Sequence, residues 1–122
     1  MTPSYFLGID VGGSHITLAL IDAATFDLLP DSVVRENLDP HTHAAAILDV
    51  FEHAIPACAA KTGPAAVRGV GIAIPGPFAY EEGVCRITPS QNKYEQLFGV
   101  NFRTYLSNAL DTRAKPVIFN ND

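Results

Sequence analysis

Two short apolar runs near the start of the chain, separated by a pair of glycines, constrain its fold more than any other feature. Tyr5 to Asp10 and Ile16 to Ile21 each have the length of a strand, and Gly12-Gly13 lies between them. Apolar runs on either side of such a pair are typical of two antiparallel strands joined by a tight turn. The sequence therefore predicts a β-hairpin at the start of the chain.

The spacing of the apolar residues changes after Thr42. From Ala44 to Cys58 they recur at intervals of three and four, which places them on one face of a helix that covers a sheet. Pro56 falls inside this pattern and cannot donate to the carbonyl of Glu52, so we expect a kink or a break there. Gly63-Pro64 is expected to end the helical region.

The remaining segments complete the order of elements. We expect a third strand at Asp27 to Arg35 interrupted at Pro30-Asp31, buried strands at Val67 to Ile74 and Val117 to Phe119, a short strand or hairpin arm at Gly83 to Ile87, and a second helix at Phe102 to Leu110 that follows a helical turn around Tyr94 to Phe98. This order favours an α/β fold, a mixed sheet with helices on its faces whose later strands are parallel.

Composition excludes several classes of protein. The 122 residues suffice for one domain with one core. No apolar run approaches the roughly 20 residues that cross a membrane, and a net charge of -5 with scattered basic residues argues against a nucleic-acid surface. Met1 to Ser4 lacks the pattern of a signal peptide, so we expect a cytoplasmic location. Cys58 and Cys85 are too few for a disulfide framework and are expected to be buried thiols.

The glycine pair also suggests a binding site for a ligand. Glycines at Gly12 and Gly13 permit positive φ and let backbone N–H groups converge on an anion such as a phosphate. Asp10 stands beside this turn, where a carboxylate can hold Mg²⁺ through water, and Ser14 adds a hydroxyl. The alternative is an ordinary hairpin turn with a turn-forming Asp beside it. The chain has neither GxxxxGK[ST] nor a GxGxxG before a helix, the two common nucleotide motifs.

Three motifs resemble the superfamily of sugar kinases, heat-shock proteins and actin. GIDVGGSHITLALID, from Gly8 to Asp22, resembles its first phosphate-binding motif and, more narrowly, the GIDIGGTK pattern of the ROK family of bacterial repressors and sugar kinases. GVGIAIPGPFAYEEGV, from Gly69 to Val84, is similar to that family's strand and PGP loop. VIFNND, from Val117 to Asp122, is similar to the strand that ends in its Asn-Asp pair.

This resemblance implies a fold and a set of roles. The fold would be a ribonuclease H-like (actin-like ATPase) domain with a mixed five-stranded sheet. Asp10 would be the Mg²⁺-linked carboxylate, and Gly12, Gly13 and Ser14 would face the phosphates of ATP. Gly76 would allow close approach of the sugar, and Asn121 would bind its hydroxyls. Asp122 would be the general base, since phosphoryl transfer needs an acceptor about 3 Å from the attacking oxygen. The alternative for Asn121-Asp122 is a turn at a strand end.

The resemblance also implies what the protein does. It would be a sugar kinase that uses ATP and Mg²⁺ to phosphorylate a hexose or N-acetylhexosamine, and it would form a homo-oligomer without nucleic-acid or membrane partners. The alternatives are a sugar-sensing transcriptional regulator of the same family and a non-catalytic sugar-binding module. Family members are about twice this length or more, so residues 1 to 122 would be the N-terminal lobe, ending after the last strand, and would be inactive alone. The second lobe, including any structural zinc site, would be absent.

The histidines depart from the family pattern or lie outside it. His15 stands where the family often has Lys, and we assign it no catalytic role. His41 and His43 have the spacing of metal ligands, but they precede a helix, where capping residues are commoner. We expect His53 at the surface.

Overall fold

A computed structural model describes residues 3–88, 94–110 and 116–121 of the chain. Its strands are β1 (Tyr5–Val11), β2 (His15–Asp22), β3 (Val34–Asn37), β4 (Val67–Ile74), β5 (Phe78–Ala79), β6 (Val84–Cys85) and β7 (Val117–Asn121). The helices are α1 (Ala44–Ala59) and α2 (Phe102–Leu110), and three short 3-10 helices are η1 (Pro30–Ser32), η2 (Pro64–Ala66) and η4 (Glu95–Leu97).

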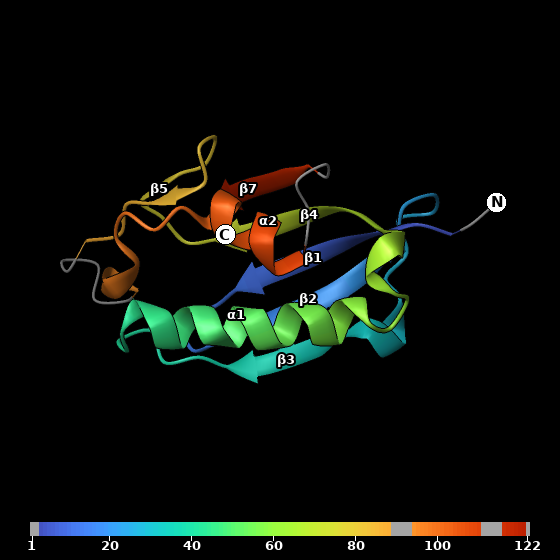
Figure 1. Cartoon of the computed structure of the whole chain (residues 1–122), viewed down its shortest axis with the longest axis horizontal. Coiled ribbons are helices and arrows are strands. Elements are labelled where there is room, and N and C mark those ends of the chain that lie inside the picture. Colours follow the sequence, from blue (N-terminus) through green and yellow to red (C-terminus); the bar gives the residue numbers. More distant parts are fainter. Residues whose placement is uncertain (1–2, 89–93, 111–115, 122) are drawn as a thin grey trace.

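Five strands form one mixed sheet in the order β3-β2-β1-β4-β7 (Figure 1). β1 and β2 form the predicted antiparallel hairpin, and β3 continues antiparallel beside β2. β4 lies parallel to β1, and β7 lies parallel to β4, as predicted for the later strands. β5 and β6 form a separate small hairpin. The predicted α/β class with a mixed five-stranded sheet is therefore confirmed.

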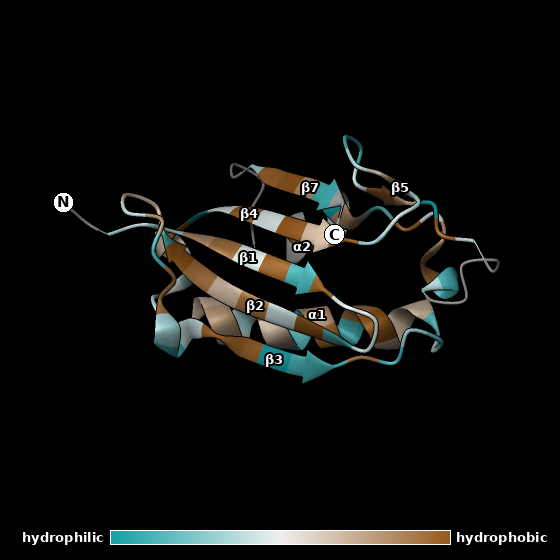
Figure 2. Cartoon of the chain, turned by 180° about the vertical axis from the view of Figure 1, so that it is seen from behind, coloured by the Kyte–Doolittle hydropathy of each residue, from teal (hydrophilic) through white to brown (hydrophobic). Residues whose placement is uncertain are grey.

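Both α-helices of the described residues lie on the same face of the sheet. Figure 1 shows α1 and α2 in front of the strands, and Figure 2 shows the same strands from behind with the helices beyond them. Alternation along the strands sends one set of side chains to the helices, and these are buried: Leu7, Ile9 and Val11 from β1, Ile16, Leu18 and Leu20 from β2, and Val70, Ile72 and Ile74 from β4. We call the opposite side the open face.

The core between sheet and helices is rich in aromatic rings. Phe51 of α1 meets Phe102 of α2 edge to face, with ring centroids 5.7 Å apart. The ring centroid of Phe78 lies 5.9 Å from that of Phe102 and 5.3 Å from that of Phe119, so the small hairpin and β7 join the same cluster. Edge-to-face and tilted pairs are the favourable geometries of such rings. These contacts tie α1, α2, β5 and β7 into one core.

Two sequence predictions require correction. The third strand covers Val34–Asn37 and not Asp27 to Arg35, because Pro30 begins the 3-10 helix η1, while only Leu28 keeps an isolated bridge to Ile21. Of the kink or break expected at Pro56, the structure excludes the break: α1 continues through Pro56 to Ala59. Pro56 is exposed, and its neighbours Ala54, Ile55 and Cys58 are fully buried, so packing on the sheet outweighs one missing hydrogen bond.

The other predicted segments agree with the structure. Val67–Ile74 and Phe102–Leu110 have the predicted bounds, the helical turn after Tyr94 is η4, and Gly63, with a φ of 92°, lies just beyond α1. No helix in the described part of the chain is both long and apolar enough to cross a membrane.

Candidate functional site

The carboxyl ends of β1, β4 and β7 meet at one edge of the sheet, because these three strands are parallel. Asp10 is paired with Ala73, Ala73 is paired with Asn120, and Ile74 is paired with Asn121. Figure 2 shows the hydrophilic ends of β1 and β7 on either side of β4 at this edge. Ligands of open α/β sheets bind outside the carboxyl ends of the strands. This edge is therefore the candidate site.

A row of paired residues crosses all five strands on the open face near that edge. In order from β3 to β7 the row consists of Arg35, Thr17, Asp10, Ala73 and Asn120. Directly paired residues share a face of the sheet, so the carboxylate, hydroxyl, amide and guanidinium of this row project to the same side. Asp10 and Asn120 are exposed, and neither helix covers them.

The row borders a groove of about 360 Å³ in the open face. Its floor consists largely of small residues, namely Gly8, Ala19, Gly71 and Ala73, and its polar wall consists of Asp10, Thr17 and Asn120. The polar groups offer oxygen donors from a carboxylate, a hydroxyl and an amide, the ligand chemistry that suits Mg²⁺. The residues present therefore fit the predicted cation at Asp10.

The turn that follows β1 places backbone amides beside Asp10. The amide of Gly12 donates to the carbonyl of His15 at 2.9 Å and closes the hairpin. Among the residues that the structure describes, no hydrogen bond involves the amide of Gly13 or Ser14, and both residues are exposed. Consecutive unbonded amides in a turn are the usual elements of an anion-binding nest.

The turn does not use the left-handed conformations that its two glycines permit. Neither Gly12 nor Gly13 has a positive φ; the described glycines that do are Gly63, Gly83 and Gly99. A Cβ at Gly12 would lie 3.2 Å from the carbonyl oxygen of His15, whereas a Cβ at Gly13 would meet nothing within 4 Å. Close approach therefore favours glycine at position 12, whereas a side chain at position 13 would meet open space.

Gly76 lies two residues beyond β4, next to the same edge. A Cβ there would lie 3.0 Å from the hydroxyl oxygen of Tyr80 and 3.4 Å from the amide nitrogen of Phe78. The Tyr80 hydroxyl donates to the carbonyl of Ile74 at 3.2 Å. The fold itself thus has a reason for glycine at this position, independent of the sugar contact that the resemblance implies.

The two residues at the end of the chain are described to different extents. The backbone of Asn121 belongs to β7 and is paired with Ile74. Asp122 lies outside the described residues. The strand that precedes it ends beside β4, at the edge where Asp10 also lies.

His15 supports a cationic group close to the turn. One guanidinium nitrogen of Arg35, Nη2, donates to His15 Nε2 at 3.0 Å. Both residues lie on the open face, since Arg35 is paired with Thr17. Position 15, where the ROK pattern that the sequence resembles often has Lys, therefore has a guanidinium beside it. Sequence analysis missed Arg35, because the contact joins residues 20 positions apart on two strands.

The other histidines contact residues outside the candidate site, and His53 lies at the surface as predicted. His43 is the N-cap of α1, and its Nδ1 accepts from the amide of Ala46 at 3.2 Å. His41 Nδ1 lies 3.3 Å from Glu95 Oε1, and the exposed His53 lies 3.9 Å from Glu36. Within the described residues no three His, Cys, Asp or Glu side chains group as a metal site. The capping prediction for His43 is confirmed.

Both thiols are free and buried, as predicted. Burial raises the pKa of Cys58 to about 11, and burial also raises the pKa of Cys85. Cys58 Sγ donates to the carbonyl of Ser32 at 3.4 Å. At neutral pH both side chains are therefore protonated.

No family model matches the sequence, and no curated protein matches it either. Solved structures do match the fold. An inorganic polyphosphate/ATP-glucomannokinase from an Arthrobacter species has a TM-score of 0.73 and 24% identity, over 98% of this chain and 44% of its own. A ROK hexokinase from Thermus thermophilus has a TM-score of 0.71 and 22% identity, over 96% of this chain and 35% of its own. A ROK glucokinase from Streptomyces griseus, in complex with glucose and AMPPNP, has a TM-score of 0.71 and 19% identity, over 97% of this chain and 33% of its own.

These matches show that the chain has the fold found in sugar kinases of the ROK type. The predicted fold is confirmed over nearly the whole length of the chain. The chain spans between a third and a half of the length of these three solved structures.

Proposed function

We propose that the chain is the N-terminal lobe of a ROK-type sugar kinase, and that the protein phosphorylates a hydroxyl of a hexose or N-acetylhexosamine with ATP. The observation that carries this proposal is the gathering of the glycine turn, Asp10 and the end of β7 at one edge of the sheet. The fold shared with ROK kinases and the three sequence motifs support it.

The roles follow from the chemistry of each group. The amides of Gly13 and Ser14 donate no hydrogen bond to any other described residue, and they would donate to phosphate oxygens. Gly12 would shape the turn. Asp10 would hold Mg²⁺ through water, and the ion would neutralise charge on the phosphates.

The sugar would lie beyond the ends of β4 and β7. Asn121 would bind its hydroxyls, Gly76 would lie against it, and Asp122 would accept the proton of the attacking hydroxyl. Catalysis needs water excluded between closing parts of the protein. Residues 1 to 122 alone leave the open face uncovered, so we propose that they have no turnover by themselves.

A panel of hexoses tests the proposal in the protein that contains this chain together with a second lobe. ADP release is measured with ATP, Mg²⁺ and glucose, fructose, allose, N-acetylglucosamine or N-acetylmannosamine. We expect turnover on at least one sugar, and Asp122→Asn is expected to reduce kcat by about 100- to 10,000-fold. Asp49→Asn, at an exposed position on α1, is the matched control and keeps full activity. Equal kcat for Asp122→Asn and wild type would remove Asp122 from the role of base.

A sugar-sensing regulator is the second candidate. A ROK family transcriptional regulator shares the fold with a TM-score of 0.69 and 20% identity, over 97% of this chain and 28% of its own. A regulator would bind a sugar of the same panel without releasing ADP on any of them. The same assay, combined with calorimetric titration of each sugar, therefore distinguishes the two functions.

A further inference from the structure

The hydroxyl of Tyr94 donates a hydrogen bond to the carbonyl of Gly12, the first residue of the turn after β1. The two residues are 82 positions apart. Tyr94 is only 1% exposed, and it is among the largest fully buried side chains of the protein. A buried hydroxyl that spans such a separation fixes the position of the backbone it contacts.

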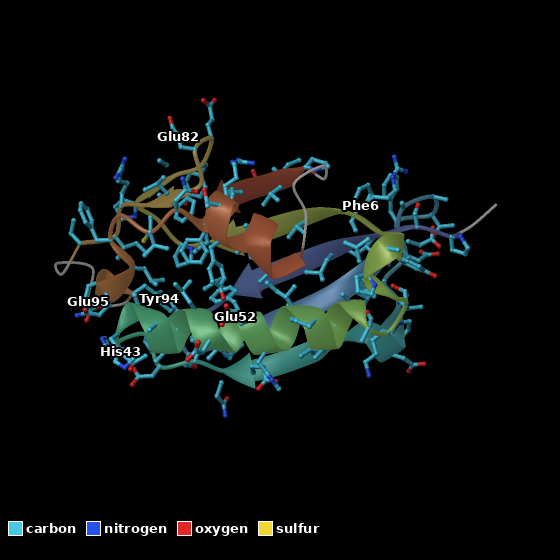
Figure 3. All side chains as sticks on the ribbon, viewed as in Figure 1. Phe6, His43, Glu52, Glu82, Tyr94 and Glu95 are labelled. Carbon is cyan, nitrogen blue, oxygen red and sulfur yellow. The ribbon has the colours of Figure 1, made fainter. Side chains whose placement is uncertain are left out.

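The backbone of Tyr94 is itself firmly placed. Its amide donates to the carbonyl of Pro40 at 2.7 Å, in the loop between β3 and α1. The next residue, Glu95, pairs with His41 in the same loop at 3.3 Å. Figure 3 shows Tyr94 and Glu95 close to His43, at the start of α1. The ring therefore extends from an anchored backbone, through the core, to the turn.

A second hydrogen bond holds the turn from the other side. The amide of Leu38, a residue that is 4% exposed, donates to the carbonyl of Ser14 at 2.8 Å. The carbonyls of Gly12 and Ser14, at the two ends of the turn, are thus both occupied by donors from outside the hairpin. The amides between them, of Gly13 and Ser14, have no such partner among the described residues.

We propose that Tyr94 is a positioning residue for the phosphate-binding turn. By holding the Gly12 carbonyl in the interior, its hydroxyl keeps the amides of Gly13 and Ser14 aimed outward, beside Asp10. This inference rests on the proposed function of the turn and adds a residue that none of the three sequence motifs contains. Burial raises the pKa of Tyr94 to about 12, so the hydroxyl keeps its proton and remains a donor across the neutral range.

The conservative variant Tyr94→Phe tests the proposal, because it removes the hydroxyl and keeps the ring in the core. The probe is inorganic tripolyphosphate with Mg²⁺, titrated into the ¹⁵N-labelled chain while amide shifts are recorded. We expect the dissociation constant to rise about 3- to 10-fold, the effect of one hydrogen bond. We also expect amide shift changes at Gly13 and Ser14 in the free variant.

Tyr105→Phe is the matched control. The Tyr105 hydroxyl donates to the carbonyl of Leu48 at 2.6 Å, in the contact between α1 and α2 and away from the turn. Tyr105→Phe therefore removes a comparable tyrosine-to-backbone hydrogen bond and should leave the dissociation constant unchanged. Equal affinity of Tyr94→Phe and wild type would overturn the role of Tyr94. A wild-type chain that shows no response of the turn amides to the probe would instead overturn the phosphate assignment of the turn.

A second measurement needs no variant. Tyrosine labelled with ¹³C at Cζ reports on each hydroxyl separately in the wild-type chain. Binding of tripolyphosphate should shift the Cζ signal of Tyr94 and leave that of Tyr105 in place. Binding that leaves the Tyr94 signal unmoved would count against the coupling of its hydroxyl to the turn.

Discussion

Asp10 lies directly opposite Thr17 across the β1–β2 pair, on the face of the sheet that neither α-helix covers. Asp10 is also paired with Ala73 on its other side, and both residues line the groove of about 360 Å³ in the open face. A carboxylate with a small neighbour and a hydroxyl beside it has space for a hydrated cation.

Replacing this carboxylate should uncouple nucleotide binding from Mg²⁺. Asp10→Asn keeps the shape of the side chain and removes its charge. We expect the affinity for Mg²⁺-AMPPNP to fall about 10- to 100-fold, the usual range when a group that supports a bound metal is lost. AMPPNP without Mg²⁺ should bind the variant and the wild type with equal affinity. Calorimetry with and without the ion measures this, and Asp31→Asn, exposed in η1, is the control. If Mg²⁺ raises the AMPPNP affinity of Asp10→Asn as much as that of the wild type, Asp10 does not hold the ion.

Ser32 is expected to matter for stability and not for binding. It is fully buried; its hydroxyl accepts from the amide of Leu20 at 2.8 Å and donates to the carbonyl of Leu29 at 2.6 Å. Ser32→Ala leaves the amide of Leu20 without its partner, which should lower the free energy of unfolding by about 1–3 kcal/mol. Urea unfolding measures the loss. Thr104→Ala removes an exposed hydroxyl and should change stability by no more than about 0.5 kcal/mol.

The same Ser32 explains why one strand was misplaced. An Asp-Ser pair after Pro30 has no apolar alternation, and the buried bonds of Ser32 depend on β2, which the local pattern does not include. The following strand, Val34–Asn37, is a polar edge strand with a single apolar residue, so it lacks the apolar–polar alternation that marks a half-buried strand. The prediction succeeded for Val67–Ile74, a largely buried apolar run, and for Phe102–Leu110, whose apolar residues recur with helical spacing.

The candidate site was predictable to a similar extent. Asp10 and the glycine turn are adjacent in sequence, so their proximity follows from the hairpin alone. Tyr94 and Arg35 were not predictable, because their contacts with Gly12 and His15 depend on tertiary packing and on strand register. The φ values of Gly12 and Gly13 were not predictable either, because a Gly-Gly pair permits left-handed conformations without requiring them.

The buried thiol of Cys58 should make stability depend on alkaline pH. Its pKa is raised by burial from 9.0 to about 11, so the folded chain binds this proton more tightly than the unfolded chain does. The resulting contribution is complete below pH 9 and is lost as the pH rises through about 11. Urea unfolding at pH 8 and pH 10.5 should show a smaller decline for Cys58→Ala than for the wild type. Equal declines would mean that the thiol does not titrate differently in the two states.

The open face should drive association of the isolated chain. Ile118 of β7 is 59% exposed, and it borders a hollow of about 250 Å³ with Phe6 and Gly69. Exposed apolar patches on a sheet face tend to associate. Light scattering between about 10 µM and 1 mM, the range in which such contacts form, should show mass rising with concentration. Ile118→Lys should suppress that rise. Leu28→Lys, at a residue 52% exposed outside this hollow, should leave it unchanged. A wild-type chain that stays monomeric throughout would show that the open face is not adhesive.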